Sequence, residues 1–179
     1  MTSITIDGST QLVAELGEVP AKVERAMVRA INRALASGRT VMVREMARDL
    51  KMRAGDIREA MPIQEASLGR PAGRFGASPK RIPLIKFNAR QTQRGVTADT
   101  GQGRKVYPGA FIARMPTGHV GVYARKGRKR LPIVERLGPS LGLIFAKYRP
   151  LGEARAREAF EQNFDHELAF ARSQGGGDA

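Results

Sequence analysis

Apolar residues recur at helical spacing along the first third of the chain. The positions that share one helical face are Val19, Val23, Met27, Ile31, Leu35, Met42, Met46 and Leu50. This pattern predicts a long amphipathic helix over residues 19–50, and Pro20 in its first turn is typical of a helix start. Gly38 in the middle of this helix costs about 1 kcal/mol relative to alanine, which favours a bend or a close contact with another chain.

A second helical pattern lies towards the other end of the chain. Its apolar positions are Leu151, Ala154, Ala159, Phe160, Phe164, Leu168 and Ala171. They predict a C-terminal helix over residues 151–172 that packs against the first helix. The preceding apolar run, residues 141–148, is interpreted as a separate short helix because Pro150 is expected to end it. Residues 173–179 are predicted to form a flexible tail.

Between the helices the apolar pattern changes to the alternation and β-branched runs that are typical of strands. Residues 2–7 predict a short strand, and residues 82–87 are predicted to pair with residues 94–98 as a hairpin. A second hairpin is predicted from residues 109–114 and 119–125, which a Pro-Thr-Gly turn separates. We therefore expect an α+β fold, in which the two helices pack on a small, mainly antiparallel β-sheet with basic loops.

The length of 179 residues suits one domain over residues 1–179. Its expected parts are the long helix at 19–50, a flexible arm at 67–79, a β-rich basic centre at 82–125, the C-terminal helix at 151–172 and the tail at 173–179. The arm is rich in Gly, Pro and Arg, so it is either a plain linker or a segment that becomes ordered against a neighbouring subunit. Its predicted inter-subunit residues are Arg70, Arg74, Phe75, Lys80 and Arg81.

The charge is concentrated in the middle of the chain. The protein carries 31 Lys and Arg against 17 Asp and Glu, a formal net charge of +14. Residues 67–150 hold eighteen of these basic residues and two acidic ones, whereas residues 1–66 hold ten and nine and residues 151–179 hold three and six. The basic centre is therefore expected to face a polyanion or an acidic protein surface, although an ordinary solvated surface is the alternative.

The candidate contact residues in this centre are Arg104, Lys105, Arg114, Arg125, Lys126, Arg128, Lys129 and Arg130. Such a cluster could contact DNA phosphates without reading their sequence, and its affinity would then fall as salt rises. The same residues could instead dock on acidic patches of a neighbouring protein. A smaller basic stripe, Arg25, Arg29 and Arg33, could grip acidic side chains or phosphates, or remain a solvated face.

Catalytic and cofactor-binding motifs are missing from the sequence. There is no cysteine, and His166-Glu167 lacks the second histidine of a zinc-protease motif because Phe170 occupies its position. The centre has only Asp99 and Glu135 as carboxylates, too few for a two-metal site. We therefore expect no enzyme activity, no cofactor and no metal. Because no apolar run approaches about 18 residues, we also expect no membrane span and a soluble, unexported product.

The central block also carries a resemblance to a known family. Its successive motifs are Tyr107-Pro-Gly-Ala-Phe-Ile-Ala, Gly118-His-Val-Gly-Val-Tyr, a Lys/Arg cluster, Leu131-Pro-Ile and Leu137-Gly-Pro-Ser. This order resembles the minor tail protein Z family of lambda-like, long-tailed phages. The resemblance implies a structural virion protein that completes the head-proximal end of the tail, so that the tail joins the head and DNA passes through its channel.

The same resemblance implies partners and a location. The protein would form a homo-oligomeric ring, for which a hexamer is one candidate, and contact other tail and neck proteins and phage DNA, without a membrane. It would reside in the tail of the virion and, during assembly, in the host cytoplasm. The competing interpretation is a free nucleic-acid-binding protein that uses the basic hairpin independently of sequence.

Overall fold

The structure is a computed structural model that describes residues 2–7 and 21–173. The predicted helix start at residues 19–20 and most of the predicted tail lie outside the described residues. The chain forms two compact units. Unit 1 comprises residues 1–42, 61–77 and 145–179, and unit 2 comprises residues 43–60 and 78–144.

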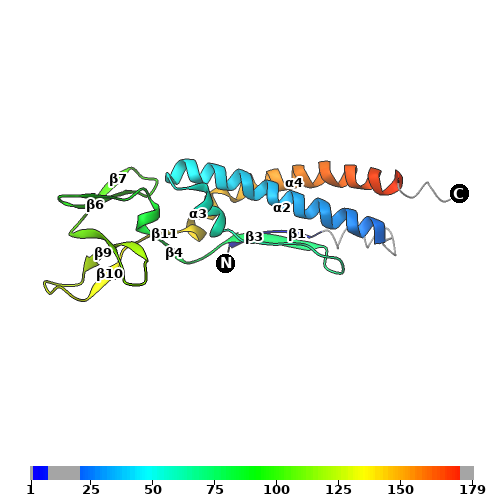
Figure 1. The fold of residues 1–179 in the computed structure, drawn as a ribbon. Coiled ribbons are helices and arrows are strands. Elements are labelled where there is room, and N and C mark those ends of the chain that lie inside the picture. Colours follow the sequence, from blue (N-terminus) through cyan, green and yellow to red (C-terminus); the bar gives the residue numbers. More distant parts are fainter. Residues whose placement is uncertain (1, 8–20, 174–179) are drawn as a thin grey trace. The chain divides into compact units, whose positions relative to one another are not determined.

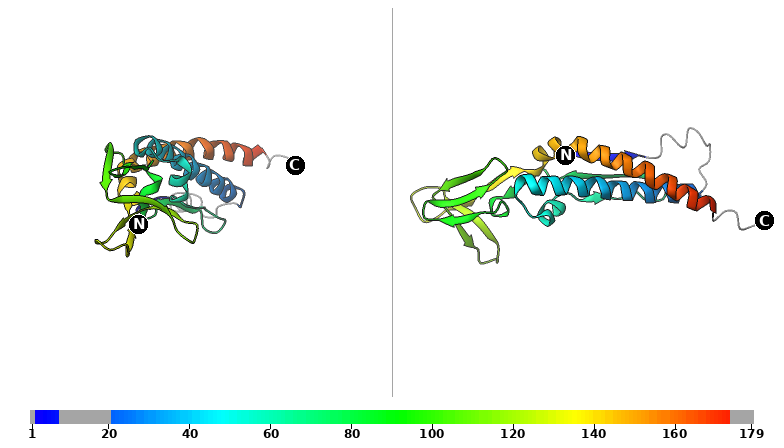
Figure 2. Two further views of the ribbon diagram at one scale, coloured as in Figure 1. Left: turned by 60° about the vertical axis from the view of Figure 1, so that its left-hand side comes forward. Right: turned by 90° about the horizontal axis from the view of Figure 1, so that it is seen from above.

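Unit 1 consists of two long helices and a three-stranded antiparallel sheet (Figure 1). Its elements are helices α2 (Ala21–Leu50) and α4 (Leu141–Ser173), each with some residues in unit 2, and strands β1 (Thr2–Asp7), β2 (Ile63–Gln64) and β3 (Ala72–Ala77). The helices lie side by side in each view in which both are clear (Figures 1 and 2). Strand β3 is the central strand of the sheet, and it is antiparallel to both β1 and β2. The predicted long N-terminal helix is confirmed over its described length.

Strand β3 corrects the prediction of a flexible arm at 67–79. It contains Gly73 and Gly76, and a Cβ atom at these positions would lie 2.5 Å from Leu35 Cδ1 and 2.7 Å from the Thr2 carbonyl oxygen. The glycines that suggested a loop therefore allow α2 and β1 to approach the strand closely. Phe75 in this strand is only 1% exposed and packs edge-on to Phe145, with ring centroids 6.1 Å apart. The prediction that Phe75 belongs to an inter-subunit arm is wrong, because its side chain fills the core of unit 1.

Helix α4 corrects the prediction of two helices separated by Pro150. Pro150 lies inside a continuous helix, although a proline there removes a backbone hydrogen bond at a cost of about 3 kcal/mol. Burial on both sides of it offsets this cost, since Phe145, Tyr148 and Ala156 all face the interior.

The two helices of unit 1 approach each other closely at small residues. A Cβ atom on Gly38 would lie 2.8 Å from the Gly152 carbonyl oxygen and 3.0 Å from Ala156 Cβ. A Cβ atom on Gly152 would in turn lie 2.2 Å from Met42 Sδ. The close contact expected at Gly38 is therefore made within the chain, between α2 and α4.

Replacing Gly38 with valine is expected to lower the free energy of unfolding by about 1–3 kcal/mol, because the new side chain must push α4 away. Chemical denaturation followed by circular dichroism measures the change. Gly55 is the control, since a Cβ atom there meets nothing within 4 Å. Gly55→Ala should leave stability unchanged or raise it by up to about 1 kcal/mol, as expected for a helical position. Equal effects of the two substitutions would contradict this packing.

An ion-pair bridge also joins the helices of unit 1. Glu167 on α4 is 4% exposed, and its two carboxylate oxygens lie 2.6 Å from Arg29 Nε and 2.7 Å from Arg33 Nη1 of α2. Arg29 and Arg33 of the basic stripe therefore bind an acidic side chain of their own chain, which is one of the alternatives left open by the sequence, whereas Arg25 donates to the Ala21 carbonyl. Two charge-assisted bonds satisfy the buried carboxylate.

Unit 2 contains three small antiparallel sheets and short helical turns. One sheet has the order β5-β6-β7, the second has the order β10-β9-β8, and the third pairs β4 with β11. Their bounds are β4 (Arg81–Pro83), β5 (Arg90–Thr92), β6 (Gly95–Asp99), β7 (Arg104–Pro108), β8 (Ala110–Arg114), β9 (Val120–Arg125), β10 (Ile133–Glu135) and β11 (Leu137–Ser140). The unit also contains α3 (Ala54–Glu59) and the short 3-10 helix η1 (Leu84–Lys86). The α+β class is confirmed, with the strands divided among several small sheets.

The first predicted hairpin is wrong and the second is confirmed. Residues 82–87 do not pair with residues 94–98, because 81–83 form β4 against β11 and 84–86 turn into η1. Strand β6 pairs instead with its neighbours in sequence, β5 and β7. The second hairpin is present as β8 and β9, whose register places Ile112 opposite Val122.

Candidate partner-binding surface

The β8–β9 hairpin is closed by the turn that its sequence predicts. The Met115 N–H donates to the His119 carbonyl at 2.8 Å, and the Gly118 N–H donates to the Met115 carbonyl at 2.8 Å. Gly118 has a φ of +83°, a conformation that residues with a side chain rarely adopt. The hairpin is joined to the neighbouring sheet of unit 2, because the Ile112 N–H donates to Gln91 Oε1 at 2.8 Å. The β8–β9 hairpin is therefore tied to the sheet that contains β5.

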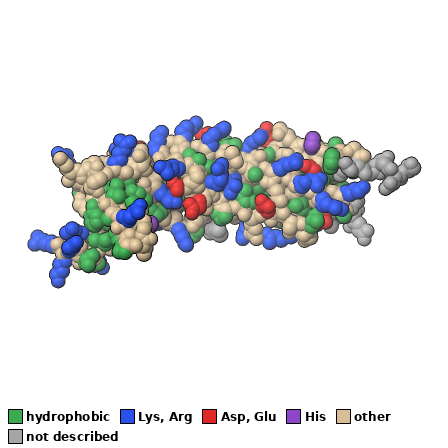
Figure 3. Space-filling view, viewed as in Figure 1, with side chains coloured by type: hydrophobic (Ala, Val, Ile, Leu, Met, Phe, Trp, Pro, Cys, Tyr) green, Lys and Arg blue, Asp and Glu red, His purple; other side chains and the backbone are tan. Residues whose placement is uncertain are grey.

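Beyond β9 the chain forms a second, strongly basic hairpin with β10. The Lys126 N–H donates to the Pro132 carbonyl at 3.1 Å and closes the loop between the two strands. We call the side chains that it carries the cationic tip: Arg125, Lys126, Arg128, Lys129 and Arg130. All are exposed, and none forms an ion pair with any residue that the structure describes. Figure 3 shows Lys and Arg side chains gathered on this loop.

Glu135 is the acidic residue nearest in sequence to the cationic tip, and its carboxylate is engaged elsewhere. Glu135 on β10 lies with its Oε1 2.9 Å from His119 Nε2, at the far end of β9 from the tip. Burial, together with the neighbouring Glu135 carboxylate, raises the pKa of the Tyr123 phenol. Glu135 therefore binds His119, which directly precedes β9, and does not neutralise the charge of the tip.

The other predicted cations are not brought to the tip. Arg104 and Lys105 lie on β7 in a different sheet, where Arg104 donates to Thr97 Oγ1 at 3.0 Å and Lys105 donates to Gln102 Oε1 at 3.2 Å. Arg114 is exposed at the turn end of β8, paired in register with the first residue of β9. Five of the eight predicted contact residues thus form one surface, and three lie apart.

Two of the four basic residues predicted for the arm bind strands of their own chain through their side chains. Arg74 donates to Gln64 Oε1 of β2 at 2.8 Å, and Arg81 donates to the Gly138 carbonyl of β11 at 2.9 Å. Arg70 closes a tight turn through backbone bonds with Ser67. Lys80 is exposed. Contact of these residues with a neighbouring subunit remains a prediction.

Exposed apolar residues adjoin the cationic tip, and sequence reasoning missed them. Leu131 is 67% exposed at the end of the loop, and Val134 is 52% exposed on β10. Strand β10 is an edge strand of its sheet. The two consecutive apolar residues Ile133 and Val134 offered a weak signal, because successive residues of a strand point to opposite faces and one face of an edge strand can lie in solvent.

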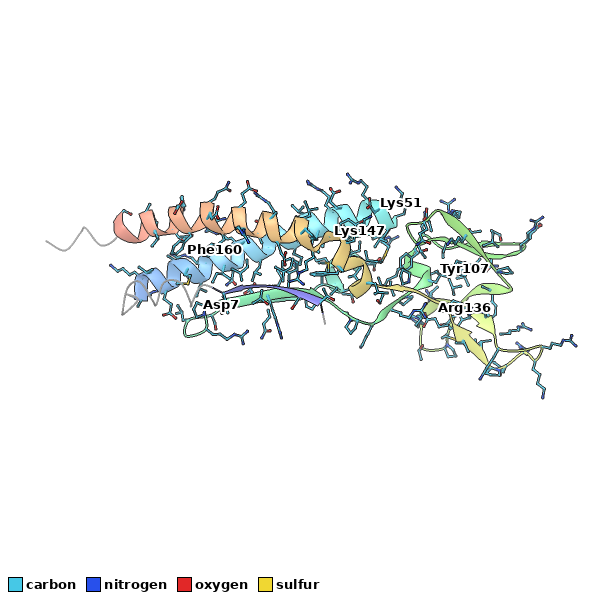
Figure 4. All side chains as sticks on the ribbon, turned by 180° about the vertical axis from the view of Figure 1, so that it is seen from behind. Asp7, Lys51, Tyr107, Arg136, Lys147 and Phe160 are labelled. Carbon is cyan, nitrogen blue, oxygen red and sulfur yellow. The ribbon has the colours of Figure 1, made fainter. Side chains whose placement is uncertain are left out.

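Each unit also has a surface depression. In unit 2 a depression of about 560 Å³ includes Lys51, Lys86 and Asp56 in its lining. Lys86 Nζ lies 2.9 Å from Asp56 Oδ1, and this hydrogen-bonded contact raises the pKa of Lys86. In unit 1 a depression of about 730 Å³ is lined by β1 and α4, where Asp7 and Phe160 are labelled in Figure 4.

Residues 2–7 and 21–173 contain neither a metal-binding cluster nor a membrane-spanning helix. Among these residues, no group of three or more His, Cys, Asp or Glu side chains is placed to hold a metal ion. Within the same ranges, no helix combines the length and the apolar character that crossing a membrane requires.

Comparison with known proteins identifies the family. A family profile described as prophage minor tail protein Z (GPZ) matches residues 6–172, which is most of the chain and includes α2, α4 up to residue 172 and every strand of unit 2. No curated protein and no solved structure matches the chain. The profile covers the central block on which the resemblance was based and extends far beyond it. The chain therefore belongs to the prophage minor tail protein Z family.

Proposed function

We propose that this phage minor tail protein completes the head-proximal end of the tail, supports the joining of tail to head and helps to hold the channel through which DNA passes. Its family makes it a virion component that works among other virion proteins. The observation that carries the more specific role is the cationic tip, five exposed cations without an ion pair among the described residues. Such a surface is suited to bind a partner that supplies negative charge.

The proposed role is mechanical and needs no catalysis. The described residues provide a helical unit, a basic hairpin and no cluster of metal-binding side chains. We propose that the protein acts in the assembled tail after passing through the host cytoplasm, and that it works as a homo-oligomer. A ring is the arrangement that would surround a channel, since heterologous contacts that close generate rings.

The cationic tip also supports a second candidate function, a free protein that binds nucleic acid independently of sequence. The two functions differ in their response to salt and in their assembly state. A free binder would remain small and would shift any duplex DNA at low salt, with affinity falling steeply as salt rises. A tail component would instead co-purify with tail proteins in stoichiometric amounts.

The test of the proposed function uses a phage or prophage from which the coding sequence has been deleted. We expect such cells to accumulate filled heads and separate tails, and to regain joined particles when the intact chain is supplied in trans. Electron microscopy counts the joined particles, and a plaque assay measures DNA delivery. Normal numbers of joined, infectious particles without the protein would overturn the proposed role.

A further inference from the structure

The cationic tip is a mixed surface, because its charged residues adjoin exposed apolar ones. Leu131 follows the last cation of the tip directly, and Val134 lies on the strand that returns from the loop. A nucleic-acid backbone would satisfy the cations but would leave these two apolar side chains in water. The combination therefore favours a protein partner, one that offers apolar contacts next to carboxylates.

Helix α4 carries an exposed face with this composition. Residues at successive steps of three and four positions lie on one side of a helix. The exposed residues with this spacing, here called the α4 stripe, are Leu151, Ala154, Glu158, Glu161 and Asp165. The stripe begins with apolar residues, among them Leu151 at 42% exposure, and continues with three carboxylates.

The carboxylates of the stripe are poorly compensated. Glu158 pairs with Arg155 at 2.8 Å, on the same helix. Glu161 and Asp165 form no ion pair with any residue in the described part of the chain. Residues 151–179 carry six acidic residues against three basic ones, the opposite balance to that of unit 2.

We propose that the cationic tip of one copy docks on the α4 stripe of a second copy. The cations would then meet Glu158, Glu161 and Asp165, while Leu131 and Val134 would cover Leu151 and Ala154. The two surfaces differ, so the contact is heterologous and each copy can both donate a tip and accept one. Repetition of this contact builds a ring if the rotation closes and a filament if it does not.

The overall positive charge of the chain does not prevent this contact. Two copies with a net charge of +14 each repel one another at long range. At physiological ionic strength the Debye length is about 8 Å, so the charges that face each other directly dominate the interaction. Association is therefore expected to be strongest at intermediate salt, where repulsion is screened and the local pairs remain.

The inference rests on the proposed function in one respect, because it takes the tip as the surface through which the protein works. The two can nevertheless fail separately. Particle assembly tests the role in the tail, whereas the mass of the purified protein tests the contact between copies. If the purified protein forms the contact between copies but particles without the protein still join heads to tails, only the proposed function is refuted. If particles without the protein fail to join but the purified protein forms no such contact, only this inference is refuted.

The test compares the wild-type protein with charge-reversed variants by light scattering after size-exclusion chromatography and by sedimentation. The tip-reversed variant carries Arg128→Glu, Lys129→Glu and Arg130→Glu. The stripe-reversed variant carries Glu158→Lys, Glu161→Lys and Asp165→Lys. We expect the wild type to form oligomers and each variant alone to associate at least about 100-fold more weakly, because like charges then face each other.

The decisive comparison is a mixture of the two variants. A reversed tip should dock on a reversed stripe, and association should return to within about tenfold of the wild type. Circular dichroism verifies that both variants fold, and glutamine in place of the reversed residues gives a milder series if either does not. A monomeric wild type, or two variants that do not recover on mixing, would overturn the inference. It would also be overturned if the tip-reversed variant kept its oligomeric state and lost only its binding to a short duplex DNA, because the tip would then face nucleic acid.

Discussion

Replacing Phe75 with alanine is expected to lower the free energy of unfolding by about 3–5 kcal/mol, the range for removing a large aromatic side chain from a core. The side chain is almost fully buried on the central strand of unit 1 and packs on Phe145. The helices and the outer strands of the unit cannot collapse into the space without disrupting their own packing. Urea denaturation followed by circular dichroism measures the loss of stability, and the melting temperature should fall by about 6–20 °C.

The matched control is the neighbouring residue on the same strand. Arg74 is exposed on the opposite face of β3 and contacts Gln64 through its side chain. Arg74→Ala should change stability by no more than about 1 kcal/mol, since exposed polar contacts contribute little. If Phe75→Ala were as mild as this control, then β3 would not be the core strand and residues 67–79 would behave as the arm that the sequence suggested.

Neutralising the cationic tip is expected to reduce the yield of infectious particles by on the order of 100-fold or more. The variant carries glutamine at Arg128, Lys129 and Arg130, which keeps the side chains polar and removes three charges. Removing one charge-assisted interaction weakens binding by at least about 1 kcal/mol. Three such losses add to about 3 kcal/mol, which corresponds to a reduction in affinity on the order of 100-fold. A plaque assay after complementation of the deleted gene measures the yield.

A second variant removes the same amount of charge from outside the tip. Lys22, Arg53 and Arg58 are exposed and form no ion pair with a residue in the described ranges. Their replacement with glutamine should leave the yield within about threefold of the wild type, because exposed charges outside the contact surface contribute little to affinity. Equal reductions in the yield of infectious particles for both variants would mean that the yield depends on total charge and not on the cationic tip.

The parts of the fold that could be predicted are those in which local pattern and tertiary role agree. The face of α2 that repeats every three or four residues is buried, from Met27 to Leu50. The β8–β9 hairpin has β-branched and aromatic strands and a turn glycine at positive φ. In both cases the residue types that favour the element also fill its place in the core.

The parts that could not be predicted depend on contacts between segments that are distant in sequence. Gly73 and Gly76 weaken a strand and so favour a loop locally, and only the approach of Leu35 and Thr2 explains their place in β3. Pro150 locally favours a helix end, yet burial on both of its sides keeps α4 continuous. Neither contact is visible in a local window of sequence.

The candidate surface shows the same division. Charge density alone indicates the cluster from Arg125 to Arg130, because Glu135 is the one acidic residue between positions 100 and 150. The same criterion adds Arg104, Lys105 and Arg114 to this cluster, yet strand pairing sends them elsewhere in unit 2. The exposure of Leu131 and Val134 depends on the position of β10 at the edge of its sheet, which sequence alone does not give.

We propose that the cationic tip is a contact surface of the assembled tail, and site-specific photocrosslinking tests this contact directly. A photoreactive residue at Gly127 would lie in the middle of the tip, where an added Cβ meets nothing within 4 Å, and Gly55 offers an equally open control position. After irradiation of purified particles, mass spectrometry of the products from position 127 should identify specific residues of a neighbouring virion protein, and the proposed docking of the tip on the α4 stripe places them in residues 151–165 of a second copy. Products from position 127 that are no more abundant or specific than those from position 55 would show that the tip is not a contact surface.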